Sequence, residues 1–156
     1  MKVMPRPEAK SRLQATVGDH KNVVAVREVS YEVLKGEWYA CIRMDLCELG
    51  DFLQATQEGA FDNEDDVRSA FLQTIDGVEH CHQRQVFHRD LKPGNVLCSK
   101  EGKKVQVKIA DFGLATDRCV CYEGHGVYGT YMYMPPERIQ KLHARDVAYS
   151  PKEQDV

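Results

Sequence analysis

The sequence has 156 residues, of which 42% are hydrophobic and 29% are charged, and its formal net charge at pH 7 is -3. This composition excludes an intrinsically disordered chain, and the small negative charge argues against a broad nucleic-acid-binding surface. No apolar run has the length of a membrane span, and the N-terminus has no apolar core of a secretory signal. We therefore expect one globular domain in the cytoplasm or nucleus, with no nucleic-acid or membrane partner and with its six cysteines reduced.

The first part of the chain predicts one helix followed by two strands. Apolar residues in Glu8–Val17 have a weak helical spacing, and Gly18 is a suitable stop. The valine-rich residues 23–31 and the aromatic and apolar residues 38–46 are typical of strands. A turn signal at residues 35–37 joins them, so we expect an antiparallel pair.

The middle of the chain predicts a long helix and then two short strands. Residues 63–66 combine a capping residue with acids of a first helical turn, and apolar side chains then recur at three- and four-residue spacing as far as Cys81. Short strands are expected at residues 95–98 and 105–110, on either side of a turn. After Asp111 the glycines and prolines indicate loops. The fold class that follows is α+β.

The polar chemistry is concentrated in residues 88–95, which read His-Arg-Asp-Leu-Lys-Pro-Gly-Asn. Asp90 can accept a hydrogen bond from an attacking hydroxyl and take its proton. Lys92 can neutralise charge on a transferring phosphoryl group, and Asn95, five residues after Asp90, can offer its amide oxygen to Mg²⁺.

Two further motifs follow in order. Asp111-Phe112-Gly113 begins 16 residues after Asn95, and residues 129–137 read Gly-Thr-Tyr-Met-Tyr-Met-Pro-Pro-Glu. Each motif alone could be an ordinary turn or surface cluster, but their order and spacing together resemble the catalytic domain of eukaryotic Ser/Thr protein kinases. Several short segments resemble the fungal Ran-type branch of these kinases.

This resemblance implies the two-lobe protein-kinase fold and the transfer of the ATP γ-phosphoryl group to Ser or Thr hydroxyls of protein substrates, with ATP and Mg²⁺ as cofactors. By the resemblance, Asp90 is the base, Lys92 stabilises charge, and Thr130 contacts the base and marks Ser/Thr specificity. Asn95 and Asp111 are the metal ligands. Structural roles are implied for residues around them: His88, Arg89, Phe112, Gly113, Glu137 and Asp155.

The resemblance also places the adenine site. Met44 stands at the gatekeeper position, and Asp45 and Cys47 lie in the hinge whose backbone binds adenine. Asp51 matches the acid that binds the ribose, and Leu97 matches the residue that packs beneath adenine. Residues 1–46 are then a small-lobe remnant from helix C to the fifth strand, and residues 47–156 run from the hinge to the start of helix F.

Some family features are not found in the sequence, and these leave two alternatives open. It contains no Gly-x-Gly-x-x-Gly and no Val-Ala-x-Lys, the helix C glutamate has no assignable match, and Asp155 stands near the last residue. We therefore expect a truncated kinase domain whose activity on its own is doubtful. One alternative is an inactive remnant that binds partners, and the other is a small-molecule phosphotransferase.

The activation segment departs from the usual pattern as well. Gly126 stands at the usual phosphorylation position, and the substitutes Thr116, Tyr122 and Tyr128 are weak candidates. Arg89 could bind a phosphate, but activation without loop phosphorylation is a hypothesis that the sequence permits. A zinc site at Cys119, Cys121 and His125 is disfavoured, because the spacing is wrong and no second ligand pair is evident.

Overall fold

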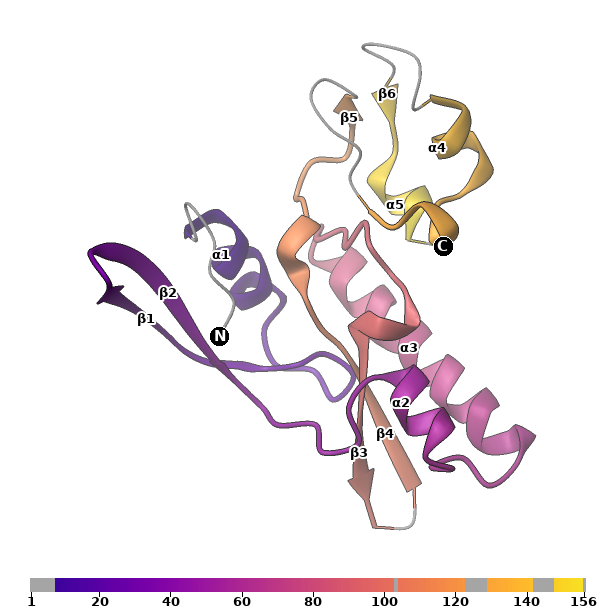
Figure 1. Ribbon diagram of the computed structural model, residues 1–156. Coiled ribbons are helices and arrows are strands. Elements are labelled where there is room, and N and C mark those ends of the chain that lie inside the picture. Colours follow the sequence, from indigo (N-terminus) through magenta and orange to yellow (C-terminus); the bar gives the residue numbers. More distant parts are fainter. Residues whose placement is uncertain (1–7, 103, 123–128, 142–147, 156) are drawn as a thin grey trace.

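The computed structural model describes residues 8–102, 104–122, 129–141 and 148–155 of the chain. The α-helices are α1 (Glu8–Val17), α2 (Phe52–Gln57), α3 (Glu64–Gln83), α4 (Pro136–Lys141) and α5 (Pro151–Gln154). The strands are β1 (Val26–Leu34), β2 (Glu37–Met44), β3 (Val96–Glu101), β4 (Lys104–Ile109), β5 (Cys121–Tyr122) and β6 (Ala148–Tyr149). Within the described residues the strands form three antiparallel pairs, β1–β2, β3–β4 and β5–β6. The β3–β4 hairpin lies against the long helix α3, whereas the β1–β2 pair extends away from it (Figure 1).

The N-terminal elements occur in the predicted order, but the bounds of both strands are shifted: β1 ends three residues later than predicted, and β2 begins one residue earlier and ends two residues earlier. Helix α1 has the predicted bounds, and Gly18 ends it with a φ of 70°. Strand β1 begins three residues later than predicted, at Val26. The residues before it pair with the end of β4 instead, because the Val24 amide donates to the Ile109 carbonyl at 2.9 Å.

Helix α3 forms where the sequence predicted it, but only part of its predicted apolar stripe is buried. The Asn63 side chain caps it by accepting from the Asp66 amide at 3.1 Å. Phe71 is 65% exposed, whereas the small residues Ala70, Gly77 and Cys81 are buried. A Cβ atom on Gly77 would lie 2.6 Å from the Asn22 carbonyl oxygen, so this face lets the backbone before β1 approach the helix closely.

Two apolar clusters flank the β3–β4 hairpin and form the core. One joins α1, α3, β4 and the segment after it: Val17, Val23, Cys81, Val86, Ile109, Phe112 and Ala115. The other joins α2, α3 and the hairpin: Ala55, Ala70, Val96, Cys98 and Val107. Burial raises the pKa of the Cys81 and Cys98 thiols to about 12, so both act as small apolar core groups.

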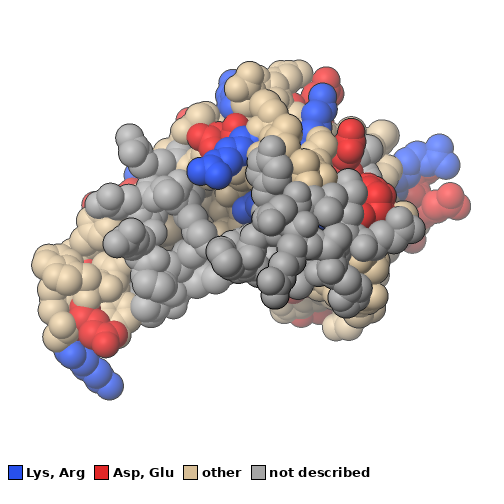
Figure 2. Space-filling model, turned by 90° about the horizontal axis from the view of Figure 1, so that it is seen from above, with Lys and Arg blue, Asp and Glu red and all other residues tan. Residues whose placement is uncertain are grey.

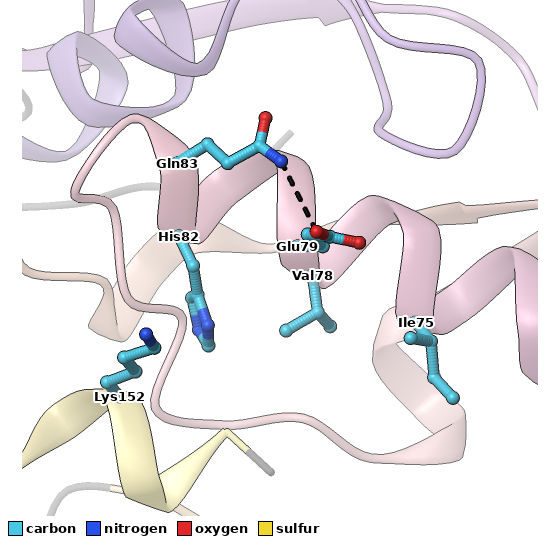
Figure 3. A pocket seen from close by; sticks show the side chains of 6 residues that line it. All are labelled: Ile75, Val78, Glu79, His82, Gln83 and Lys152. Atoms are coloured by element: carbon cyan, nitrogen blue, oxygen red, sulfur yellow. Dashed lines mark hydrogen bonds between the residues drawn. The ribbon is translucent and has the colours of Figure 1, made fainter.

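The C-terminal part contains more regular structure than the expected loops. Short 3₁₀ helices span Pro93–Asn95, Phe112–Leu114 and Tyr131–Tyr133, and β5, β6, α4 and α5 gather at the C-terminal end of α3 (Figure 1). Helix α5 faces α3 across a shallow hollow (Figure 3), which is lined by Ile75, Val78, Glu79, His82, Gln83 and Lys152. Helix α2 was also absent from the prediction, because its six residues are too few to show a helical period.

The surface is mixed in charge. On the face seen in Figure 2, basic and acidic side chains of the described residues lie interspersed. No helix in the described part of the chain is both long and apolar enough to cross a membrane.

Candidate active site

The loop before Asp90 is held from below by one buried carboxylate. Asp155, whose side chain is 1% exposed, accepts the backbone amides of His88 and Arg89 at 2.6 Å each. Its oxygen also lies 3.1 Å from His82 Nε2 on α3. Arg89 has a φ of 67°, in the left-handed region that costs energy for a residue with a side chain. The carboxylate thus holds a backbone turn that would not be stable without it.

Three side chains, those of Thr130, Lys92 and Asn95, meet around the Asp90 carboxylate. The Thr130 hydroxyl donates to Asp90 Oδ1 at 2.7 Å, and the Lys92 ammonium lies 3.1 Å from Oδ2. Lys92 also donates to the Thr130 hydroxyl at 2.7 Å. Asn95 Nδ2 donates to Oδ2 at 3.1 Å and to the Asp90 carbonyl at 2.8 Å. Residues from distant parts of the chain therefore form one hydrogen-bonded group.

This arrangement sets the ionisation of Asp90. Partial burial acts to raise the pKa of the carboxyl, but the hydrogen bonds from Thr130, Lys92 and Asn95, together with the charge of Lys92, outweigh it. The pKa of Asp90 is consequently lowered, and the carboxylate is ionised at neutral pH. A charged acceptor beside a cation is suited to receive a proton from a hydroxyl.

Asn95 and Asp111 are brought to the same edge of the β3–β4 hairpin. The Ala110 amide, next to Asp111, donates to the Asn95 carbonyl at 2.9 Å. The side-chain nitrogen of Asn95 donates to Asp90, so its side-chain oxygen is the atom that can face a cation. Asp111 adopts a left-handed φ of 61°, and its carboxylate accepts from the Gly113 amide at 3.2 Å. Carboxylate and amide oxygens suit Mg²⁺.

Phe112 joins this edge to the core. It is buried among the cluster that includes Val17 of α1, and its ring meets the His88 ring edge-on, with centroids 4.9 Å apart. His88 Nε2 lies 2.9 Å from the Ala110 carbonyl oxygen. The segment with Asp111 and the loop with Asp90 are thus packed together by two buried rings.

The predicted adenine-binding residues lie beside the start of β3 and the end of β4, at the same end of the hairpin as Asn95 and Asp111, and some of them are more exposed. Met44 is 44% exposed, and Cys47 is half-buried. The Asp45 carboxylate binds Arg27 at 2.6 Å and Lys108 at 3.3 Å. Asp51 caps α2 by accepting from the Gln54 amide at 2.9 Å, and it forms an isolated bridge with Leu97 on β3.

The segment after Thr130 is anchored beneath the catalytic loop. Gly129 has a φ of 108°, and a Cβ atom there would lie 2.8 Å from the Arg89 carbonyl oxygen. Glu137 is exposed on the first turn of α4, whereas its neighbour Arg138 is buried. Among the phosphorylation candidates, Thr116 is buried and pairs through its backbone with Phe87, and Tyr122 belongs to β5. Tyr128, Gly126 at the usual phosphorylation position and His125 of the disfavoured zinc site fall outside the described residues.

Three supporting residues were not found from the sequence. His82 reaches Asp155, the Gln154 side chain donates to the Arg89 carbonyl at 2.8 Å, and the Tyr149 hydroxyl accepts from Arg89 at 3.0 Å. None stands in one of the motifs.

The family model described as "Protein kinase domain" matches residues 8–155. The chain belongs to the protein kinase domain family. Its fold is the kinase-like α+β fold, with a small β region followed by a helical part, as the sequence predicted. The family uses ATP with a divalent metal ion and acts on protein substrates.

Curated relatives of this kinase chain include several Ser/Thr protein kinases. It is 35% identical over 143 residues to "Serine/threonine-protein kinase ksp1" of Schizosaccharomyces pombe, which covers 88% of the chain and 28% of that protein. It is 38% identical over 129 residues to "Carbon catabolite-derepressing protein kinase" of Secale cereale, covering 80% of the chain and 24% of that protein.

A third relative is "Calcium/calmodulin-dependent protein kinase type II alpha chain" of Drosophila melanogaster. It is 34% identical over 123 residues, which cover 78% of the chain and 22% of that protein. The kinase chain therefore spans about a quarter of the length of these relatives. The resemblance to the Ran-type branch and the division into lobes at residues 46 and 47 stay predictions.

Proposed function

We propose that this kinase transfers the γ-phosphoryl group of ATP to Ser or Thr hydroxyls of intracellular protein substrates. The observation that supports this most directly is the hydrogen-bonded group formed by Asp90, Lys92, Asn95 and Thr130. It places an ionised acceptor, a cation and an amide within reach of one another, as phosphoryl transfer requires.

In this proposal Asp90 is the base. The hydroxyl of a substrate Ser or Thr would donate a hydrogen bond to the carboxylate. The carboxylate would orient this hydroxyl toward the phosphorus and take its proton late in the transfer. The lowered pKa of Asp90 keeps the carboxylate ionised, so it can accept the hydrogen bond of the hydroxyl, and makes it a weak base, which is consistent with taking the proton only late in the transfer. Thr130, which donates to Oδ1, fixes the orientation of the carboxylate and organises the loop that approaches it.

Lys92 is proposed to offset the charge that develops on the transferring group. Its ammonium lies between Asp90 and the Thr130 hydroxyl, at 3.1 and 2.7 Å. Three donors on a single nitrogen allow it to keep these contacts and still approach a phosphoryl oxygen. A cation at this point stabilises the transition state more than the ground state, because the transferring phosphoryl group, with charge on its three equatorial oxygens, moves toward the acceptor hydroxyl.

Asn95 and Asp111 are proposed to hold the divalent metal, through the Asn95 amide oxygen and the Asp111 carboxylate. The oxygen donor set fits Mg²⁺, and the backbone bond from Ala110 to Asn95 fixes the two residues side by side. When bound, Mg²⁺ would neutralise charge on the phosphates of ATP. Phe112 and Gly113 would support Asp111, because the Phe112 ring anchors the segment and the Gly113 amide donates to the carboxylate.

The adenosine part of ATP is proposed to lie along the hinge. Met44 would border the site, the backbone of Asp45 and Cys47 would bind adenine, Asp51 would bind the ribose, and Leu97 would pack beneath the base. The bridge between Asp51 and Leu97 supports this grouping, since it holds the ribose acid next to the strand that leads from Asn95. His88, Arg89, Glu137 and Asp155 are proposed as structural residues around the loop.

The test compares Asp90→Asn with the wild type in the natural full-length protein, using γ-labelled ATP and a mixture of Ser/Thr peptides. We expect the substitution to lower kcat by about 10²- to 10⁴-fold while the unfolding midpoint stays close to that of the wild type. Asp65→Asn, the same chemical change on an exposed residue of α3, is the matched control and should retain activity.

Two results would contradict the proposal. A wild-type protein that transfers no label, and that Asp90→Asn does not change, would favour a binding module without catalysis. Transfer to small alcohols or amino sugars in preference to peptides would favour a small-molecule phosphotransferase.

A further inference from the structure

Arg89 is the point at which the catalytic loop, the segment after Asp111 and the β5–β6 pair meet. Its guanidinium donates to the Leu114 carbonyl at 2.6 Å through Nε and to the Tyr149 hydroxyl at 3.0 Å through Nη1. Nη1 also lies 3.9 Å from Cys121 Sγ on β5. One side chain therefore ties three separate stretches of the chain to the residue before Asp90.

Tyr149 is itself held firmly. It is 7% exposed, and its backbone pairs with Cys121 in the β5–β6 register. The buried Arg138 guanidinium stacks on the Tyr149 ring, 3.9 Å from its centroid, and donates through Nε to Gln154 Oε1 at 3.3 Å. Gln154 in turn donates to the Arg89 carbonyl. The hydroxyl thus meets Arg89 from a fixed position, at little further cost in conformational entropy.

A phosphate on a loop orders its surroundings by offering acceptor oxygens to arginine side chains. In this kinase the Arg89 guanidinium already has a carbonyl oxygen, a hydroxyl and a sulfur as partners, all supplied by the protein. The hydroxyl comes from β6, close to the catalytic loop, so it can hold Arg89 without any modification of the segment between Asp111 and Thr130.

We propose that Tyr149 is a positioning residue whose hydroxyl holds Arg89, and with it the catalytic loop, so that phosphoryl transfer does not require phosphorylation of the activation segment. This inference rests on the proposed function, which supplies the reaction. It differs from a space-filling role for Tyr149, because only the hydroxyl makes the contact with Arg89.

The first experiment needs no catalysis. Tyr149→Phe keeps the ring against Arg138 and removes the hydroxyl, which contacts Arg89 and also hydrogen-bonds with Arg138. Tyr31→Phe, on an exposed residue of β1, is the matched control. In the natural full-length protein, thiol alkylation is followed by mass spectrometry at two cysteines of the same segment, the buried Cys121 and the exposed Cys119.

We expect Cys121 to react about tenfold faster in Tyr149→Phe, with Cys119 unchanged, because loss of the charge-assisted hydrogen bonds of this hydroxyl favours local opening of β5 by about that factor. An unchanged rate at Cys121 would overturn the inference. An equal increase at both cysteines would overturn it as well, since it would show general loosening and not the loss of one hydroxyl.

The second experiment measures transfer to peptide after exhaustive phosphatase treatment. The treated wild type and Tyr31→Phe should stay active, and Tyr149→Phe should lose about tenfold in kcat while KM for ATP changes less than about twofold. A wild type that loses its activity on treatment, or a Tyr149→Phe variant with normal kcat, would overturn the inference. A wild type inactive in every state, and equal to Asp90→Asn, would instead overturn the proposed function.

Discussion

The two ends of the candidate ATP site are held by different kinds of interaction. At the phosphoryl end, Asp90 and the loop before it are fixed by largely buried hydrogen bonds, two of which are donated by backbone amides to the Asp155 carboxylate. At the hinge end, Leu46 is 86% exposed, and the main side-chain contacts of Asp45 are ion pairs with Arg27 and Lys108. Buried bonds to a charge are worth far more than exposed ion pairs.

This difference corresponds to what each end would have to do. Phosphoryl transfer depends on positioning and electrostatic stabilisation, so its groups need to be placed before substrate arrives. Adenine recognition through backbone groups needs only a backbone segment of suitable shape, so changes of side chain there should affect binding little. Substitutions at the phosphoryl end should therefore cost more than those at the hinge.

The largest effect is expected from Asp155→Ala. Two buried backbone amides, those of His88 and Arg89, would lose their acceptor, and the left-handed turn at Arg89 would lose its support. We expect a loss of about 2–4 kcal/mol in the free energy of unfolding and a loss of at least about 100-fold in kcat. Denaturant unfolding and peptide phosphorylation measure the two quantities.

The conservative variant Asp155→Asn serves as the comparison, since it retains one acceptor oxygen and should lie between wild type and Asp155→Ala. If Asp155→Ala unfolds at the same denaturant concentration as the wild type, the phosphoryl end is not the more rigidly held of the two.

A smaller effect is expected from Gly129→Ala. The residue has a φ of 108°, and the new Cβ atom would lie 2.8 Å from the Arg89 carbonyl oxygen, which is backbone and cannot move aside easily. We expect a cost of about 1–3 kcal/mol in the free energy of unfolding together with a lower kcat. Gly102→Ala, at a φ of 64° with no atom within 4 Å, separates backbone strain from the clash.

The elements that could be predicted are those whose residues act through local rules. The bounds of α1, the cap and extent of α3, the antiparallel β1–β2 pair and the two short strands on either side of a turn follow from spacing, capping and turn residues. The meeting of Asp90, Asn95 and Asp111 followed from motif order alone. The roles assigned to these residues stay proposals.

The features that the sequence did not predict depend on tertiary contacts. Helical spacing does not predict that Phe71 is exposed and Gly77 is buried on α3, because it marks apolar positions and not close approaches of the backbone. Gly77 is buried because the Asn22 carbonyl oxygen approaches the helix there. Tyr149 and Gln154 contact Arg89 although they are 60 and 65 residues away from it in the sequence, and no local pattern predicts such a contact.

The pH dependence of transfer tests the electrostatics of the phosphoryl end. The hydrogen bond from Thr130 helps to lower the pKa of Asp90, so the carboxylate stays ionised, and active as a base, to a lower pH than an ordinary carboxyl. Thr130→Val removes the hydroxyl and should raise the pKa of Asp90. The acid limb of the kcat/KM profile should therefore move to higher pH.

Thr130→Ser keeps a hydroxyl at this position and should leave the acid limb near that of the wild type. An unchanged limb in Thr130→Val would mean that the Thr130 hydroxyl does not set the ionisation of Asp90, whatever its effect on kcat.

The smallest effect is expected at the hinge, from Arg27→Met and Lys108→Met. Arg27 is largely exposed, so its ion pair with Asp45 is screened by solvent and salt, and either substitution alone should change KM for ATP by less than about threefold and leave kcat unchanged. Steady-state kinetics at low and high salt measure this, and any difference should shrink as salt is raised. The double variant removes both partners of Asp45 and should have a somewhat larger effect on KM only. A fall in kcat comparable to that of Gly129→Ala would contradict the comparison, because it would mean that the three charges joining β1, the hinge and β4 position the catalytic loop as strongly as the buried bonds beneath it.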